Sequence, residues 1–154
     1  MTEIAYKPRG LYFEEFEIGH VLVTAGRTVT ESDIVRFAGL SGDFNQIHTD
    51  ADYAAGNPFG QRVAHGLLVQ SIASGLAVQS GVIEGTVLAF RELSCKFSLP
   101  VYIGDTIRVN LEIVEKKALP RLGGGQVVMK IRVFNQQGKA VQRGSWVMLV
   151  KSKE

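Results

Sequence analysis

The feature that most limits the fold of this chain is a run of apolar and small residues between positions 63 and 80. A helix that is apolar around most of its circumference belongs in a protein core and not on a surface. Gly81 and Gly85 mark the end of the run, because glycine is poorly suited to a helix interior. We therefore expect one buried helix that the rest of the chain must cover.

The cover is predicted by four later segments in which apolar and polar residues alternate, as is typical of half-buried β-strands. These segments are residues 86–99, 107–114, 127–133 and 141–150. The alternation slips at Arg91 and Glu92, where a β-bulge is expected. Residues 135–139 predict the turn between the last two strands, and residues 123–125 predict a flexible hairpin loop. The expected class is α+β, with a curved antiparallel sheet wrapped around one central helix.

The amino-terminal part of the chain is predicted to be less regular. Residues 1–20 form an extended lead-in, and residues 21–29 are rich in β-forming types. Thr30 and Asp33 have the spacing of a capping box, so a short helix is expected to begin there. From position 41 to position 62 the sequence loses its periodicity, which predicts a long ordered loop. Long loops in compact domains are uncommon and often functional, so this loop is the first candidate for a site.

Composition and charge exclude several classes of protein. The chain has 154 residues, 45% of them hydrophobic and 21% charged, so we expect a single domain over residues 1–154. The net charge of +2 and the absence of a basic run argue against nucleic acid as a partner. No signal peptide and no segment of membrane-spanning length is found, so we expect a cytoplasmic protein. Cys95 is the only cysteine, which excludes an intrachain disulfide and favours a buried, inert thiol.

Asp43 and His48 are the first candidates for chemistry, because both lie in the non-periodic segment. With ordinary pKa values near ~3.9 and ~6.5, they supply a carboxylate and a proton acceptor at neutral pH. Phe44 and Ile47 are expected to anchor the segment in the core, and Asn45 is a natural turn former. Taken alone, the spacing is weak evidence, because a loop aspartate often caps a turn and a loop histidine is often merely solvated.

His65 and Gly66 strengthen that case, because they stand where the buried helix is expected to begin. The first amides of a helix have no acceptor within the helix, and the helix dipole adds partial positive charge there. Gly66 has no side chain, so a ligand oxygen can approach its N–H and be stabilised as it gains negative charge. Ser74, two turns further on, either lines the site or bonds back to its own helix. His65 is either a ligand contact or a core histidine beside the helix start.

Other kinds of site find no support in the sequence. His20, His48 and His65 lack the spacing of a zinc site, so no metal centre is expected. No glycine-rich phosphate loop joins a strand to a helix, and no G-x-S-x-G nucleophile motif occurs.

Taken together, these motifs resemble those of the MaoC-like dehydratase family, which includes R-specific enoyl-CoA hydratases. The similar segments are Ser41–His48, Asp52–Ala54, Val63–Gly66, Phe97–Val101 and Gly104–Asp105, and the resemblance runs from about Phe13 through the last strand. It implies the hotdog fold, a curved antiparallel sheet around one long helix, which agrees with the architecture predicted above.

The resemblance also implies roles for individual residues. Asp43 and His48 match the family's catalytic pair, Gly66 its carbonyl-binding amide, and Ser74 a serine that lines the site. Asn45 and His65 are further candidates for substrate contacts. The family's loop usually carries a proline where this chain has Gln46, so the rigidity of this loop needs another source.

The implied reaction is the reversible syn addition of water to a trans-2-enoyl-CoA thioester, giving an R-3-hydroxyacyl-CoA. Coenzyme A would be part of the substrate, and no separate cofactor is expected. Members of the family are dimers or higher oligomers, so a homodimer with its site at the subunit junction is expected. Two alternatives stay open: a hotdog acyl-CoA thioesterase, and an acyl-CoA-binding module without activity.

Overall fold

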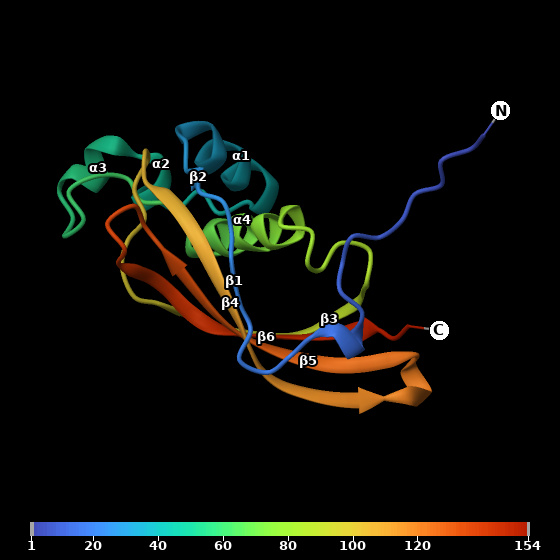
Figure 1. Ribbon diagram of the computed structural model, residues 1–154. Coiled ribbons are helices and arrows are strands. Elements are labelled where there is room, and N and C mark those ends of the chain that lie inside the picture. Colours follow the sequence, from blue (N-terminus) through green and yellow to red (C-terminus); the bar gives the residue numbers. More distant parts are fainter. Residues whose placement is uncertain (1, 154) are drawn as a thin grey trace.

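The structure, a computed structural model, describes residues 2–153 and consists of helices gathered on one side of an antiparallel sheet (Figure 1). The helical elements are η1 (Phe13–Glu15), α1 (Glu31–Ser41), α2 (Gln46–Thr49), α3 (Ala51–Ala55), α4 (Gly66–Gln79) and η2 (Pro120–Leu122). The strands are β1 (Val21–Val23), β2 (Arg27–Thr28), β3 (Val87–Phe97), β4 (Thr106–Leu119), β5 (Gly124–Phe134) and β6 (Ala140–Lys151).

The sheet has the strand order β1-β4-β5-β6-β3, and β2 pairs with the first two residues of β4, Thr106 and Ile107. All pairs are antiparallel, and the predicted bulge is confirmed by a register shift between Phe90 and Glu92. The predicted turn between β5 and β6 is also confirmed, because the Asn135 N–H donates to the Lys139 carbonyl at 3.0 Å. The expected α+β architecture is therefore correct.

The prediction of a flexible hairpin loop at residues 123–125 is wrong. Gly124 and Gly125 belong to β5, where they pair with β4 and β6, and the connection from β4 is made by η2 instead. At Gly124 the backbone of β6 comes so close that a Cβ atom would lie 1.9 Å from the Val150 carbonyl oxygen. The glycines therefore permit close strand pairing here and do not provide a flexible loop.

Helix α4 lies across the concave face of the sheet, as the apolar run predicts (Figure 1). Its buried residues are Leu68, Val69, Gln70, Ile72, Ala73, Leu76 and Ala77. They pack against inward-facing residues of β4, β5 and β6, including Val109, Met129 and Trp146. In the described part of the chain, no helix is long and apolar enough to cross a membrane.

The capping box predicted for the short helix is confirmed at the start of α1. The Thr30 hydroxyl accepts from the Asp33 N–H at 3.2 Å, and the Asp33 carboxylate accepts from the Thr30 N–H at 2.9 Å. Helix α1 ends at Ser41 and is capped by Gly42, whose N–H donates to the Ala38 carbonyl at 2.8 Å. This fixed end determines where the following segment leaves the helix.

The prediction that residues 41–62 form one long loop is only partly correct, because the short helices α2 and α3 lie within it. Each begins at a polar cap. The Asn45 side chain accepts from the Ile47 N–H at 3.4 Å, and the Asp50 carboxylate accepts from the Tyr53 N–H at 2.9 Å. Helices of four and five residues are too short to produce a hydrophobic period, so only their caps could have indicated them.

The central position of α4 gives a prediction about stability. Ile72 is 4% exposed and lies in the core, so Ile72→Ala should lower the free energy of unfolding by about 2–5 kcal/mol. Val35→Ala on the exposed side of α1 is the control and should change it by less than about 1 kcal/mol. Urea denaturation followed by circular dichroism measures both, and equal effects would contradict the central role of α4.

Candidate active site

A pocket of about 450 Å³ opens between the start of α4, the segment around α2 and the chain that follows β3. Asp43, His48, His65 and Gly66 all contribute to its wall. The rest of the wall is mostly apolar and includes Ile47, Phe59, Val69, Phe97, Leu99 and Val101. An apolar pocket with a few convergent polar groups is typical of a small-molecule site.

His48 reaches this pocket from α2, and its ring has a defined tautomer. Its Nδ1 lies 2.7 Å from the Val63 carbonyl oxygen, which can only accept a hydrogen bond, so Nδ1 carries the hydrogen and donates it. Nε2 is then the nitrogen with a free lone pair. Val63 is itself held, because its N–H donates to the Ile47 carbonyl at 3.1 Å. The backbone thus orients His48 as a proton acceptor.

The surroundings of His48 also favour its neutral form. The side chain is only 7% exposed, and this burial lowers the pKa of His48 below its ordinary value of 6.5. The hydrogen bond to Val63 and the nearby Asp43 oppose the shift, while His65 adds to it. At neutral pH His48 is therefore unprotonated and able to accept a proton.

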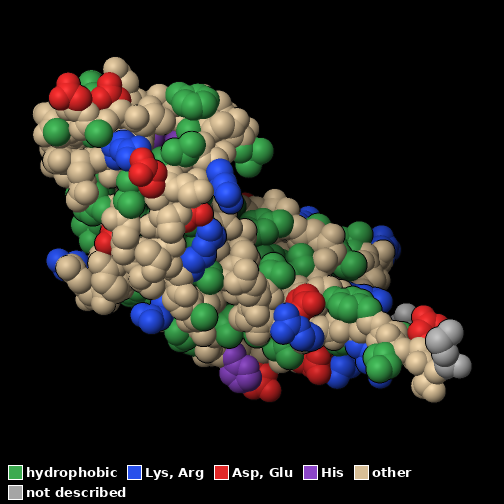
Figure 2. Space-filling view, turned by 90° about the horizontal axis from the view of Figure 1, so that it is seen from above, with side chains coloured by type: hydrophobic (Ala, Val, Ile, Leu, Met, Phe, Trp, Pro, Cys, Tyr) green, Lys and Arg blue, Asp and Glu red, His purple; other side chains and the backbone are tan. Residues whose placement is uncertain are grey.

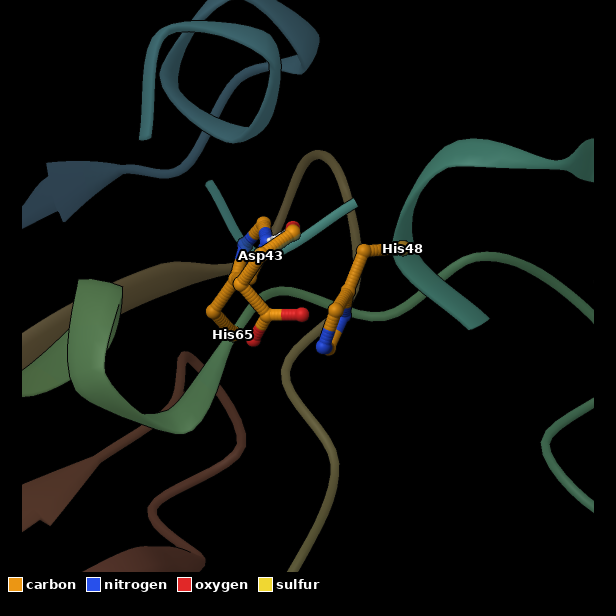
Figure 3. A group of neighbouring side chains, drawn as sticks. All are labelled: Asp43, His48 and His65. Atoms are coloured by element: carbon orange, nitrogen blue, oxygen red, sulfur yellow. Dashed lines mark hydrogen bonds between the residues drawn. The ribbon is translucent and has the colours of Figure 1, made fainter. Parts of the chain in front are cut away.

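Asp43 follows the end of α1, and backbone contacts fix its position. Its N–H donates to the Ser41 hydroxyl at 3.1 Å, and its carboxylate accepts from the Asn45 N–H at 3.2 Å. The carboxylate points toward the ring of His48 (Figure 3). Asp43 remains exposed, so a second acceptor beside His48 stays accessible from the pocket.

His65 contacts both of the other two residues. Its ring stacks on His48, with the centroids 3.8 Å apart and the planes 27° apart, and its Nε2 donates to the Asp43 carbonyl at 2.9 Å. Phe37 covers another side, at 4.9 Å between ring centroids. His65 is 2% exposed, and its two contacts fix Asp43 and His48 relative to each other. Its Nδ1 is buried without a hydrogen-bond partner among the described residues.

Gly66 is the first residue of α4 and lies against the end of β3. A Cβ atom at this position would lie 2.4 Å from the Phe97 ring, so no larger residue fits without displacing that ring. As a first-turn residue of the helix, Gly66 has an N–H that needs no acceptor within the helix. The packing gives Gly66 its own reason to lack a side chain, and the role of its amide at the site stays a prediction.

The remaining predicted site residues lie elsewhere or have other contacts. Ser74 donates its hydroxyl to the Ser71 carbonyl at 2.8 Å and is outside the pocket wall as far as the structure describes it, so its role at the site stays a prediction. Asn45 caps α2. Phe44 is 61% exposed, so the prediction that it anchors the segment in the core is wrong, whereas Ile47 is half-buried and lines the pocket.

Phe97 and Gln142 line the pocket too, and the sequence analysis proposed neither as a site residue, although it noted the Phe97–Val101 segment. They are cross-strand partners at the ends of β3 and β6, so only the strand register brings them to the pocket. The one signal in the sequence is Gln142 itself, a polar residue at an inward-facing position of a strand in which apolar and polar residues alternate.

Asp43, His48 and His65 also require a test as metal ligands, because they offer ligand atoms within 4.8 Å of one another. A shared ion needs lone pairs that converge at about 2.0–2.2 Å from each ligand atom. The lone pair of an imidazole nitrogen lies in the ring plane, and the two stacked rings have planes only 27° apart. Their lone pairs therefore lie in two nearly parallel planes, which does not favour convergence on a single ion.

The fold is that of a hotdog protein in which Asp43, His48 and His65 meet at one pocket, and comparison with known proteins agrees with this fold. The family model described as "MaoC like domain" matches residues 15–133, so the chain belongs to this family. Protein MaoC of Klebsiella aerogenes is 45% identical over 116 residues, covering 75% of this chain and 34% of that protein. An (R)-specific enoyl-CoA hydratase of Aeromonas caviae is 32% identical, covering 76% of this chain and 83% of that protein.

Solved structures support the same assignment. An R-hydratase from Pseudomonas aeruginosa has a TM-score of 0.78 and 34% identity, with 94% of this chain and 88% of that chain covered. A protein described as a monoamine oxidase regulatory protein from Archaeoglobus has a TM-score of 0.87 and 38% identity, with 94% and 97% covered. The match spans about a third of the Klebsiella protein and 66% of a 3-hydroxybutyryl-CoA dehydratase from Methylorubrum extorquens.

The lowered pKa of His48 gives a prediction for the pH dependence of catalysis by this site. A general base must be unprotonated, so activity should be lost as the pH falls through the pKa of His48. Because burial lowers that pKa, the acid limb of kcat/KM should lie below pH 6.5. A kcat/KM profile between pH 4.5 and 8, recorded with an enoyl-CoA, measures it. A half-maximal point above 6.5 would exclude His48 in this environment as the base.

Proposed function

We propose that this protein adds water reversibly to trans-2-enoyl-CoA thioesters to give R-3-hydroxyacyl-CoA products. The observation that carries the proposal is the His48 tautomer, which leaves Nε2 free beside the Asp43 carboxylate and the start of α4. Relatives named enoyl-CoA hydratase and 3-hydroxybutyryl-CoA dehydratase support the same class of reaction. One buried core that reaches from Phe16 to Val150 supports the prediction that residues 1–154 act as a single domain.

In the proposed reaction, His48 and Asp43 hold one water molecule between them. His48 Nε2 accepts a proton from this water as the oxygen bonds to the β-carbon of the substrate. The Asp43 carboxylate accepts a hydrogen bond from the second O–H of the water, whose hydrogen stays on the oxygen, and so directs the attacking lone pair. The proton taken up by the pair then returns to the α-carbon on the same face, so that the elements of one water are added.

The start of α4 supplies the electrostatic part of the mechanism. As water attacks the β-carbon, electron density moves through the conjugated system to the thioester carbonyl oxygen. The Gly66 N–H, strengthened by the helix dipole, donates to this oxygen as it becomes negatively charged. A preorganised donor of this kind is worth roughly 3–4 kcal/mol in comparable sites.

The main alternative is a thioesterase, in which the same water attacks the carbonyl carbon and releases coenzyme A. A carboxylate alone can direct water for hydrolysis, so that reaction gives no role to a neutral histidine with a free Nε2. An acyl-CoA-binding module without activity would need neither Asp43 nor this tautomer. The combination of both groups at one end of the pocket therefore favours hydration.

Crotonyl-CoA separates these functions in one assay. Hydration removes the absorbance of the conjugated thioester without releasing thiol, and the product should have the R configuration. Thiol release would indicate a thioesterase, and no change with several chain lengths would contradict the enzyme proposal. Asp43→Asn and His48→Gln should each lower kcat about 100-fold to 10,000-fold, the usual contribution of a general acid or base.

Two matched variants control for effects on folding. Asp52→Asn makes the aspartate-to-asparagine change on the exposed side of α3. His20→Gln makes the histidine-to-glutamine change at an exposed histidine outside the pocket wall. Both should retain wild-type kcat. If Asp43→Asn and His48→Gln also kept near wild-type turnover, the proposed centre would be wrong.

We also propose that the protein is a homodimer joined along β3. This strand stands at an end of the sheet, so one of its edges has no partner within the described chain. Phe90, Leu93 and Phe97 are exposed on β3, and Leu67 is exposed on the neighbouring face of α4. A second copy would pair the free edge and cover these side chains, which would otherwise form an apolar surface.

Light scattering after size-exclusion chromatography should therefore give about twice the chain mass of 16.8 kDa. Leu93→Glu places a charge on the proposed interface and should shift the protein toward the monomer. Leu40→Glu, on the exposed surface of α1, should leave the dimer intact. A wild-type monomer at micromolar concentration would exclude this interface.

A further inference from the structure

Two glutamines and a tryptophan form a buried polar chain that leads from the core to Gly66. The Trp146 Nε1 donates to the Gln70 side-chain carbonyl at 3.3 Å, and Gln70 Nε2 donates to the Gln142 carbonyl at 2.6 Å. Gln142 Nε2 then donates to the Gly66 backbone carbonyl at 2.9 Å. Gln70, Gln142 and Trp146 are 6%, 3% and 0% exposed. Burying two side-chain amides costs free energy unless they are hydrogen-bonded. The presence of this hydrogen-bond series in the core therefore calls for an explanation.

The direction of the chain follows from its first member. An indole nitrogen can only donate, so the oxygen of the Gln70 amide must face Trp146. The nitrogen of Gln70 then faces the oxygen of Gln142, and the nitrogen of Gln142 must face Gly66. No amide can be turned over without leaving a buried group unpaired. The sequence of donors therefore specifies one arrangement, and it ends on the first residue of α4.

Gly66 is held from two sides by a single pair of strand residues. Phe97 and Gln142 lie directly opposite each other on β3 and β6. The Phe97 ring occupies the space where a Cβ of Gly66 would lie, and the Gln142 amide binds the Gly66 carbonyl. Glycine is the residue with the greatest backbone freedom, and the first turn of a helix tends to fray. The contacts with Phe97 and Gln142 restrict both the backbone freedom of Gly66 and the fraying of the first turn of α4.

We propose that Gln142, oriented by Gln70 and Trp146, is a positioning residue that aims the Gly66 amide at the substrate carbonyl. The inference rests on the proposed hydratase function and adds to it a group outside the acid–base pair. Gln142 donates to the carbonyl oxygen of Gly66 and thereby restricts the backbone of the residue whose N–H is the proposed oxyanion donor. The effect should be larger on the transition state than on the bound substrate, because negative charge on the thioester oxygen develops only during the reaction.

Cys95 lies beside these hydrogen bonds between Trp146, Gln70 and Gln142 and does not replace any of them. Its sulfur accepts from Gln70 Nε2 at 3.3 Å, and its thiol lies 3.7 Å from the Gln142 oxygen. Burial raises the pKa of the Cys95 thiol, so it stays protonated and acts as a weak partner. Cys95 is only partly buried, so the expectation of a buried thiol is partly correct, and its inertness stays a prediction.

Two substitutions of Gln142 test the inference. Gln142→Met keeps the length of the side chain and removes its hydrogen bonds, while Gln142→Glu keeps an acceptor for Gln70 and loses the donor to Gly66. Loss of a whole oxyanion donor lowers kcat about 100-fold to 1,000-fold, so displacement of the donor should lower kcat about ten-fold or more. KM for crotonyl-CoA should change less than about three-fold. Gln137→Met and Gln137→Glu, in the exposed β5–β6 turn, are the matched controls and should keep wild-type kcat.

Binding of two further thioesters distinguishes positioning from a structural role. Acetoacetyl-CoA forms an enolate with negative charge on the thioester oxygen, whereas butyryl-CoA is saturated and neutral at that position. The Gln142 variants should bind acetoacetyl-CoA about ten-fold more weakly and weaken the absorbance of its bound enolate, with little change for butyryl-CoA. Thermal melting and circular dichroism identify any variant that has lost its fold, and Gln142→Met then serves in place of Gln142→Glu, or the reverse.

The outcomes separate this inference from the function on which it rests. A wild-type protein that does not hydrate crotonyl-CoA overturns the proposed function and this inference with it. An active wild type whose Gln142 variants keep kcat overturns the inference alone. Equal weakening of both thioesters would show a merely structural role and would also overturn it.

Discussion

The structure depends on how the first turn of α4 is placed at the edge of the core. The helix must be buried because its surface is apolar, yet its first amides must meet a pocket and not an apolar wall. Gly66 allows both the burial of the helix and the position of its first turn at the pocket, since the Phe97 ring can pack directly on its Cα. His65, immediately before it, contacts both Asp43 and His48, the proposed acid–base pair. Burial of the helix therefore also places His65 and Gly66 at the pocket.

Much of the fold could be predicted from the sequence because its strongest signals are periodic. The apolar run of α4, the alternation in β4 to β6 and the Thr30–Asp33 cap are local patterns, and each produces the expected element. The errors have a common cause. Helices α2 and α3 are too short to show a period, and Gly124 and Gly125 are explained by the close approach of β6, which no local pattern reveals.

The candidate site divides in the same way. Asp43, His48, His65 and Gly66 were found from loop composition and the helix start, and the structure brings all four to one pocket. Gln142 was missed, because its meaning depends on a register with Phe97 that joins residues 45 positions apart. Figure 2 adds a point about charge: acidic and basic side chains are interspersed on the helix side of the described chain, without a continuous basic surface.

Gln46 illustrates how the segment keeps its shape without the proline usual in this family. The residue is the first of α2, a position where proline is favoured because the N–H there has no partner and the backbone is already constrained. Here the Asn45 side chain caps the helix, and the Thr49 hydroxyl donates to the Phe44 carbonyl at 3.1 Å. Proline acts mainly by restricting the unfolded chain, at about 0.4–1 kcal/mol, so its absence costs stability without changing the folded geometry. His48, oriented by the Val63 carbonyl and not by its neighbours in sequence, is insensitive to that exchange.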